Sequence, residues 1–376
     1  MLSFAEATQR ILDRAKPPVA ETVSLPEAQG RILAAAQTAS YQLPPWDNSA
    51  MDGFAVRCDE LPGTLPVAGV VAAGAKPDEH RLEPGSCLKI MTGAPLPAGA
   101  DTVVMREDVH EAEGSAQFAD KPALGRHIRR AGEDVQKGSV LLEVGALLGP
   151  GELAILAAQA ITQVPVTRRP QVAILSTGDE LVPLGCDPGP GQIVSSNNIT
   201  LAAQVREAGA VPVDAGIVGD SLEQTVRALR SLSDYDVLIT SGGVSVGDFD
   251  HVKEAYEQVG ITIDFWKVAI KPGKPLAFGI AGNGQIVFGL PGNPASSLVS
   301  FELFVRPLLR KLLGHAKPNR PLLSVELTTA IDKTAGRTHF VRAELERRGD
   351  RLLATPLRKQ GSGMLRSMVS VDCFLQ

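Results

Sequence analysis

The sequence predicts a multidomain protein of the α/β plus β class, whose central domain is a three-layer α/β structure with a mostly parallel sheet. Short apolar runs alternate with helical patterns between residues 170 and 313. Short β-type runs separated by Gly and Pro occupy residues 54 to 135, and a second all-β pattern follows residue 317. The chain has 376 residues, more than the roughly 150 residues of an average domain, so several domains are expected.

Composition and charge exclude several classes of partner. The formal net charge of -5 leaves no basic footprint for nucleic acid. No uncharged apolar run reaches the roughly 18 residues of a membrane span, and the N-terminus lacks the apolar core of a signal peptide. Four cysteines lie far apart without metal-site spacing, as expected of thiols in a reducing compartment. We therefore expect a soluble, cytoplasmic protein.

The N-terminal region is expected to combine two distant segments. Ser3 and Glu6 form a capping-box pattern at the start of the first helix. A β-rich segment at 46–135 then separates residues 1–45 from residues 136–168, which hold an Ala-rich helical stretch. We predict that the β-rich segment is an inserted domain and that the two flanking segments form one linker domain.

Two polar segments stand out in the predicted β-rich domain. Residues 92–97 follow a predicted strand and offer a hydroxyl and free N–H groups at a turn. Residues 126–134 place a cationic cluster beside two carboxylates, a pattern that by itself is more typical of a solvated strand.

The region from residue 170 to 313 alternates strands with helices, which implies a parallel sheet with right-handed crossovers. Nearly all of its unusual polar and glycine-rich segments directly follow a predicted strand. Ligands in such sheets bind in the crevice at the carboxyl ends of the strands. The predicted strands are Val172–Leu175, Val211–Val218, Asp236–Ile239, Ile261–Phe265 and Gln285–Leu290.

The stretch TSGGVSVGDFD, residues 240–250, follows the third of these strands. Gly242 and Gly243 remove side chains where the backbone must turn and approach a ligand closely. Its serines and exposed N–H groups suit oxyanions such as phosphate, and Asp248 and Asp250 could hold the hard cation that phosphate chemistry needs. On its own the stretch is equally typical of a flexible strand-to-helix loop.

Acids and lysines at the predicted crevice favour a metal-assisted phosphate or pyrophosphate site, in which carboxylates hold Mg²⁺ and lysines neutralise oxyanions. No GxGxxG or GxxxxGK[ST] motif is present, which argues against a dinucleotide site and a Walker ATPase. No Ser-His-Asp set is evident, and the lone His251 is more typical of a helix start than of a catalyst. The crevice residues are Glu180, Asp220, Asp248, Asp250, Lys267, Lys271 and Lys274.

Eight segments, in chain order and over nearly the whole chain, resemble the signatures of the molybdopterin molybdenumtransferase (MoeA) family, which is related to the C-terminal domain of gephyrin. The TSGGVSVGD stretch is shared with single-domain relatives that adenylylate molybdopterin, whereas segments 46–56, 92–97 and 129–134 separate the chain from those relatives. The eight segments are PPWDNSAMDGFAV, MTGAPLPAGADTVV, RRAGEDV, STGDEL, TSGGVSVGDFD, KPGKPLAFG, LPGNPASS and GSGML.

The resemblance implies a Mg²⁺-dependent reaction in which molybdate and adenylylated molybdopterin give molybdenum cofactor and AMP. It also implies an elongated homodimer whose active site is shared between the α/β domain of one subunit and the inserted domain of the other. It allows contact with the molybdopterin adenylyltransferase and with apo-molybdoenzymes as further partners. The expected domains are 1–45 with 136–168 (elongated linker and dimerisation), 46–135 (inserted, β-rich), 169–316 (α/β, molybdopterin-binding) and 317–376 (small, β-barrel-like).

Matching motif positions implies roles for individual residues. The catalytic residues would be Asp52, Thr92, Asp134, Glu180, Asp220 and Asp250, of which Glu180, Asp220 and Asp250 would also be metal ligands. The substrate-binding residues would be Arg129, Ser241, Gly242, Gly243, Ser245, Asp248, Lys267, Lys271, Lys274, Pro291 and Pro294. The pterin dithiolene would be the nucleophile towards molybdenum, so no catalytic cysteine is needed. One departure from the family is Phe54, which stands where tyrosine is common.

Two alternatives remain at this point. The same α/β domain could serve a molybdopterin adenylyltransferase or another nucleotide phosphoanhydride enzyme. The gephyrin resemblance also allows a non-catalytic scaffold, although the intact acids Glu180, Asp220 and Asp250 argue against that reading, because a scaffold need not keep a metal-and-phosphate crevice.

Overall fold

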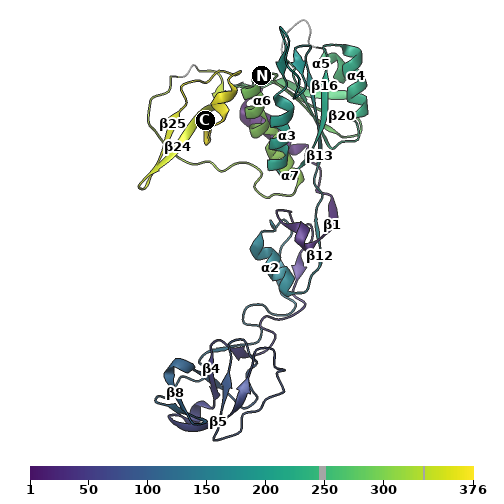
Figure 1. Cartoon of the computed structure of the whole chain (residues 1–376). Helices are drawn as coiled ribbons and strands as arrows, with labels where there is room; N and C mark the ends of the chain where they lie inside the picture. Colours follow the sequence, from purple (N-terminus) through teal and green to yellow (C-terminus); the bar gives the residue numbers. More distant parts are fainter. Residues whose placement is uncertain (245–250, 333–334) are drawn as a thin grey trace. The chain divides into compact units, whose positions relative to one another are not determined.

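The computed structural model describes residues 1–244, 251–332 and 335–376 (Figure 1). The chain divides into two compact units. The first unit comprises residues 1–34, 147–149 and 163–376, and the second comprises residues 35–146 and 150–162. The finer four-domain boundaries expected from the sequence stay a prediction.

The first unit begins with α1 (Phe4–Asp13), whose predicted capping box is confirmed. The backbone N–H of Glu6 donates to Ser3 Oγ at 3.2 Å, and the Glu6 carboxylate accepts from the Ser3 N–H at 2.8 Å. Two orphan donors of the first turn are thereby satisfied. Next, β1 (Ala20–Ser24) pairs antiparallel with β12 (Gln163–Thr167), and a 3₁₀ turn, η1 (Leu25–Ala28), follows β1.

A six-stranded sheet forms the centre of the first unit. Its first four strands run parallel, as predicted, but the last two are antiparallel to their neighbours, so the sheet is mixed. The reason is β20, which the sequence reasoning missed: the KPGKP loop turns the chain straight back beside β18 without a crossover helix. The strand order is β16 (Val211–Val218), β13 (Gln171–Thr177), β17 (Val237–Ser241), β21 (Ile286–Leu290), β20 (Pro275–Ala281) and β18 (Ile261–Lys267).

Helices cover both faces of this sheet, which confirms the three-layer arrangement (Figure 1). Along β13, Val172 and Ile174 belong to one hydrophobic cluster, while Ala173 and Leu175 belong to the other, as the two-residue period of a strand requires. The first cluster includes α1, α3 (Asn197–Glu207), α6 (Pro294–Ser300) and α7 (Arg306–Leu312), and the second includes α4 (Leu222–Ser231) and α5 (Val252–Gln258).

The helical segment that follows β21 is interrupted. A π-helical turn, η4 (Phe301–Val305), lies between α6 and α7. Pro307 follows this turn, and because proline has no N–H to donate, the regular α-helical bonding cannot pass through it.

The C-terminal part of the first unit holds a four-stranded sheet. Its strand order is β22 (Glu326–Leu327), β25 (Arg351–Pro356), β24 (Val341–Arg348) and β26 (Cys373–Leu375). Among the described residues β22 and β26 do not pair, so this sheet is open rather than the expected barrel-like structure. The short β19 (Ile270–Lys271) pairs with β23 (Thr338–His339), and η5 (Leu365–Met368) precedes β26.

The second unit is β-rich, as predicted. Its main sheet has the order β7 (Thr102–Met105), β4 (Gly53–Val56), β6 (Cys87–Ile90), β5 (Gly63–Val71), β9 (Ser115–Phe118) and β8 (Val109–Ala112). Phe54 is fully buried in one of its cores, where it packs edge-on against Phe118. The remaining elements are β2 (Gln37–Thr38), β3 (Asn48–Ser49), η2 (Cys58–Glu60), η3 (Arg106–Asp108), β10 (Ile128–Arg129), β11 (Val140–Leu142) and α2 (Pro150–Ala158).

No helix in the described ranges is long and apolar enough to span a membrane. All four cysteines are free thiols, and burial raises the pKa of Cys87 to about 11.

Candidate active site

The carboxyl ends of the four parallel strands lie at one edge of the central sheet, which we call the carboxyl edge. β18 is antiparallel to β20, and β20 is antiparallel to β21, so β18 also ends at this edge. The loops that carry the predicted acids, glycines and lysines therefore share one edge, as the sequence predicted.

The acids and the lysines lie at opposite ends of the carboxyl edge. Glu180 and Asp220 follow β13 and β16, whereas Lys267 ends β18 at the other side of the sheet. Neighbouring strands are about 4.8 Å apart, so five steps from β16 to β18 span about 24 Å. The turn at Gly242 and Gly243 after β17, which we call the glycine turn, lies between these two groups in strand order.

At the acidic end, the loop after β13 and the loop after β16 are joined by hydrogen bonds between backbone N–H groups and aspartate carboxylates. The Asp220 N–H donates to Asp179 Oδ1 at 2.9 Å, and the Asp179 N–H lies 3.4 Å from Asp220 Oδ2. The carboxylate of Glu180 lies directly against Gly178. A Cβ added at that glycine would be only 2.4 Å from Glu180 Oε2. Glu180 is exposed and Asp220 half-buried, so both carboxylates face the open edge of these loops.

The predicted metal-ligand set is only partly described. In the described part of the chain, no three acid, histidine or cysteine side chains come close enough to hold a metal ion. Glu180 and Asp220 follow neighbouring strands, but Asp250, the third predicted ligand, lies outside the described residues, as do Ser245 and Asp248.

The turn after β17 requires glycine at two positions. Gly242 and Gly243 have φ of +101° and +61°, a region that other residues rarely adopt. An added Cβ would lie 2.5 Å from the Thr177 carbonyl oxygen at Gly242, and 2.2 Å from Val252 Cγ2 at Gly243. Ser241, just before them, is 1% exposed, so its side chain contacts protein rather than the open crevice.

The LPGNP segment packs against this turn. The Gly242 N–H donates to the Leu290 carbonyl at 3.1 Å, and a Cβ at Gly292 would lie 3.5 Å from Gly242 Cα. Pro291 is buried directly after β21, and Pro294 begins α6, where its fixed φ and missing N–H suit the first turn.

At the basic end, Lys267, Lys271 and Lys274 are all exposed, and none forms an ion pair with the residues that the structure describes. Gly273 lies between two of these lysines with φ of +93°, and a Cβ there would lie 2.5 Å from Ser300 Oγ on α6. The loop thus packs closely on the helix while its ammonium groups stay in solvent.

Two aromatic residues that sequence reasoning missed support the glycine turn. Trp266 Nε1 donates to the Val244 carbonyl at 3.2 Å. The Tyr256 hydroxyl lies 2.6 Å from Thr240 Oγ1, and the two rings meet edge-on. Tyr256 and Trp266 thus contact the residues on either side of the two glycines from the face of the sheet that α5 covers.

Asn197, at the start of α3, was also missed as a site residue, whereas its neighbour Asn198 has a structural role. Asn197 bonds to Ser241 and Gly292, and Asn198 bonds to β13 and β16. The signal available in the sequence was the polar run SSNN directly before a helix, which predicts only a helix start.

The second unit brings together the polar segments predicted in its sequence. The Thr92 N–H and hydroxyl both donate to Asp52 Oδ1, at 2.6 and 2.7 Å. Both hydrogen bonds lower the pKa of the Asp52 carboxyl, and the bond from the backbone N–H has the larger effect. The side chain is exposed, so the ionised carboxylate is held in place at the surface.

A second carboxylate, missed in the sequence, anchors the cationic segment. Ala131 N–H donates to Asp47 Oδ1 at 2.8 Å, and Arg130 pairs with Asp47 Oδ2 at 2.6 Å, which lowers the pKa of Asp47. Strand pairing of β3 with β10 aligns the same segments. Arg129 and Asp134, both predicted site residues, are exposed beside this anchor.

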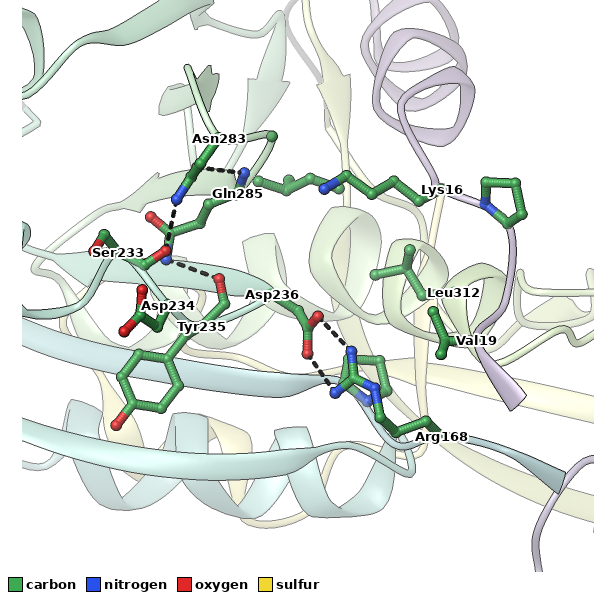
Figure 2. Close-up of a pocket in the computed structure, with 14 residues that line it drawn as sticks. Lys16, Val19, Arg168, Ser233, Asp234, Tyr235, Asp236, Asn283, Gln285 and Leu312 are labelled. Atoms are coloured by element: carbon green, nitrogen blue, oxygen red, sulfur yellow. Dashed lines mark hydrogen bonds and ion pairs between the residues drawn. The ribbon is translucent and has the colours of Figure 1, made fainter. Parts of the chain in front are cut away.

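A pocket of about 280 Å³ opens at the opposite edge of the central sheet (Figure 2). It is lined by the residues just before β13, β17 and β21, and Arg168 and Asp236 form a bidentate pair there at 2.6 and 3.0 Å. Lys16 and Asp234 also line it. None of the predicted site residues does, so the pocket does not belong to the carboxyl edge.

Comparison with known proteins covers most of the chain. Residues 2–160 match the model of the MoeA N-terminal region (domain I and II), residues 173–311 match a probable molybdopterin binding domain, and residues 324–376 match the MoeA C-terminal region (domain IV).

Curated relatives and solved structures agree with these matches. The molybdopterin molybdenumtransferase of Haemophilus influenzae is 39% identical over 383 residues, covering 100% of this chain and 94% of the relative. That of Bacillus subtilis is 39% identical over 382 residues, covering 98% and 88%. Two solved structures of a molybdopterin biosynthesis MoeA protein from Pyrococcus horikoshii are 32% and 29% identical, with TM-scores of 0.83 and 0.86, each covering 100% of this chain and 94% of the solved chain.

Proposed function

Because this chain belongs to the MoeA family of molybdopterin molybdenumtransferases, which act in molybdenum cofactor biosynthesis, we propose that it inserts molybdate into adenylylated molybdopterin and releases AMP. It is a transferase with a molybdopterin-binding domain.

One structural observation supports the proposed reaction above the others. The tight turn at Gly242 and Gly243, packed against Gly292, lies between an acidic and a basic end of the carboxyl edge. Closely packed glycine backbone can hold a phosphate group without side chains in the way. The order along the edge is acidic residues, glycine turn, lysines. A substrate with a central phosphoanhydride and anionic groups towards one end matches this order.

The basic end would hold the anionic groups. Lys267, Lys271 and Lys274 are exposed and without acidic partners among the described residues, so their ammonium charge is available to a ligand. We propose that they hold molybdate and non-bridging oxygens of the phosphoanhydride, where full positive charge neutralises oxyanions. The two dithiolene thiols of the substrate then displace one oxo group of molybdate, which leaves as water with the thiol protons, and attack of water on the phosphoanhydride releases AMP and leaves the pterin as its phosphate monoester.

The acidic end would hold Mg²⁺. Magnesium is commonly bound by one or two protein carboxylates together with substrate phosphates and water, and the accessible carboxylates of Glu180 and Asp220 fit that pattern. Asp250, which lies outside the described residues, would be the third predicted ligand. When bound, the ion polarises the phosphoanhydride as a Lewis acid.

We further propose a homodimer in which the second unit of one subunit completes the crevice of the other. Support comes from the exposed residues Asp52, Thr92, Arg129 and Asp134, which place charged and hydrogen-bonding groups on a unit other than the one that carries the crevice. Contact with the molybdopterin adenylyltransferase and with apo-molybdoenzymes remains a proposal of the same kind, as does a cytoplasmic location.

The test is release of AMP from purified adenylylated molybdopterin, with and without molybdate and Mg²⁺, followed by reconstitution of an apo-molybdoenzyme. Release that depends on both ions, with reconstitution, is expected. Release that ignores molybdate would indicate a plain phosphoanhydride hydrolase, and adenylylated pterin made from ATP would indicate an adenylyltransferase. No release from a folded protein would favour a scaffold.

A further inference from the structure

We infer that Asn197 is a positioning residue of the carboxyl edge: its side-chain amide sets the spacing between the glycine turn after β17 and the LPGNP segment after β21. The inference deepens the proposed transferase function and rests on it. It concerns a residue that touches neither substrate nor ion and acts through the two loops.

The amide of Asn197 bonds to both loops at once. Its Nδ2 donates to Ser241 Oγ at 2.7 Å and to the Gly292 carbonyl at 2.9 Å. Ser241 is the last residue of β17, and Gly292 is the second residue after β21. Both N–H donors of one planar amide are thus used, and their fixed angle determines how far apart the two loops lie.

The position of Asn197 is itself fixed. It is the first residue of α3, and it is 8% exposed. Leu201 and Val205 of α3 are buried in the same hydrophobic cluster as strand residues of β13, which fixes the helix on the sheet. A buried donor anchored in this way costs free energy when its partners move away.

The two loops that Asn197 joins are closely packed against each other and against the end of β13. A Cβ at Gly292 would lie 3.5 Å from Gly242 Cα, and one at Gly242 would lie 2.5 Å from the Thr177 carbonyl oxygen. The backbones are therefore in direct contact on one side, and the Asn197 amide holds them on the other. The backbone bond from Gly242 N–H to the Leu290 carbonyl still holds the ends of β17 and β21 together, but no other side chain in the described ranges hydrogen-bonds to both Ser241 and Gly292, so removing the amide lets the Gly292 backbone shift against the glycine turn.

Displacement of the loops should affect turnover more than binding. The residues of both loops are unchanged in such a variant, but the distance between the glycine turn and the Pro291–Pro294 segment changes. A misplacement of about 1 Å at a reacting group can cost roughly 100-fold in rate. We expect Asn197→Ala to lower kcat for molybdate-dependent AMP release roughly 10- to 100-fold, while KM changes less than about threefold.

Asn198→Ala is the matched control. Asn198 has the same side chain, is 5% exposed and sits beside Asn197 in α3, but its bonds run to β13 and β16 rather than to the two loops. Both variants should lose comparable thermal stability. Only the Asn197 variant should lose turnover at a temperature where both are folded.

A second pair keeps the shape of the side chain. Asn197→Leu and Asn198→Leu remove both N–H donors at similar side-chain volume without burying a charge or opening a cavity, so they remain informative if the alanine variants do not fold. A double-mutant cycle adds a readout that packing alone would not move: because Asn197 acts partly through Ser241, its loss should cost less in a Ser241→Ala background.

The outcomes separate the two proposals. Wild-type protein without molybdate-dependent AMP release would overturn the proposed function. Active wild type with equal kcat in the Asn197 and Asn198 variants, or fully additive effects of Asn197→Ala and Ser241→Ala, would overturn only the positioning role of Asn197.

Discussion

Thr92 places two donors on a single oxygen of Asp52: its backbone N–H lies 2.6 Å and its hydroxyl 2.7 Å from Asp52 Oδ1. The two residues come from different segments of the second unit and were predicted separately. Their bond keeps the carboxylate ionised and oriented, because both donors favour the charged form.

Replacing Thr92 by valine should therefore raise the pKa of the Asp52 carboxyl towards its ordinary value. Valine keeps the shape and the backbone N–H, so only the hydroxyl contribution is lost. Carboxyl ¹³C shifts followed through a pH titration measure the change. Thr64→Val, at an exposed position of β5 in the same unit, should leave the Asp52 titration unchanged. An unaltered Asp52 pKa in Thr92→Val would contradict the assignment of the hydroxyl bond.

Gly243→Ala should destabilise the first unit. The left-handed backbone alone costs about 1–3 kcal/mol for a residue with a Cβ, and the new atom would lie 2.2 Å from Val252 Cγ2. Urea unfolding measures the loss, and AMP release should fall with it because the glycine turn shifts. Gly282→Ala is the control, since a Cβ there meets nothing within 4 Å. Equal unfolding midpoints for the two variants would show that the turn tolerates a side chain.

Asp220→Asn should raise the Mg²⁺ concentration needed for half-maximal AMP release. Loss of one ligand charge weakens a carboxylate-bound ion, and we expect a shift of at least about tenfold. Titration of activity with MgCl₂ measures it, and a chelator should abolish release from the wild type. Asp234→Asn removes an exposed carboxylate at the opposite edge of the sheet and should not shift the curve. The same Mg²⁺ dependence in both variants would remove Asp220 from the proposed metal site.

His315 should make the folded state less stable in mild acid. Burial, followed by the charges of Arg310 and Arg306, lowers the pKa of His315 to about 4 from 6.5. The unfolded chain therefore takes up this proton first, and stability should fall as pH drops from about 6.5 to about 4.

Thermal unfolding of wild type and His315→Gln between pH 7 and pH 4 isolates this contribution from that of the carboxylates. The variant should lose less Tm over the window than the wild type. His110→Gln, at an exposed strand position, serves as the control and should keep the wild-type slope. Parallel Tm curves for wild type and His315→Gln would refute the prediction.

Much of the first unit could be predicted because its signals are local. Five consecutive buried residues form β17, and such a continuous apolar run predicts a strand covered on both faces. The antiparallel β20 was missed because the KPGKP loop looks like the end of an element, and only the pairing of Lys267 with Pro275 shows that the chain turns back. The polar segments of the second unit were found, but not Asp47, whose role depends on Ala131 and Arg130.

By itself, the sequence determined which segments are glycine-rich, acidic or basic, where each follows a strand, and that the set resembles the MoeA family. Those features follow from residue type and short-range spacing. Only the tertiary structure decided that the acids and lysines lie at opposite ends of one edge, and that Asn197 joins Ser241 to Gly292. The physical reason is separation along the chain: 44 and 95 residues divide Asn197 from its partners, and contacts over such distances depend on how the sheet and α3 pack rather than on any local pattern.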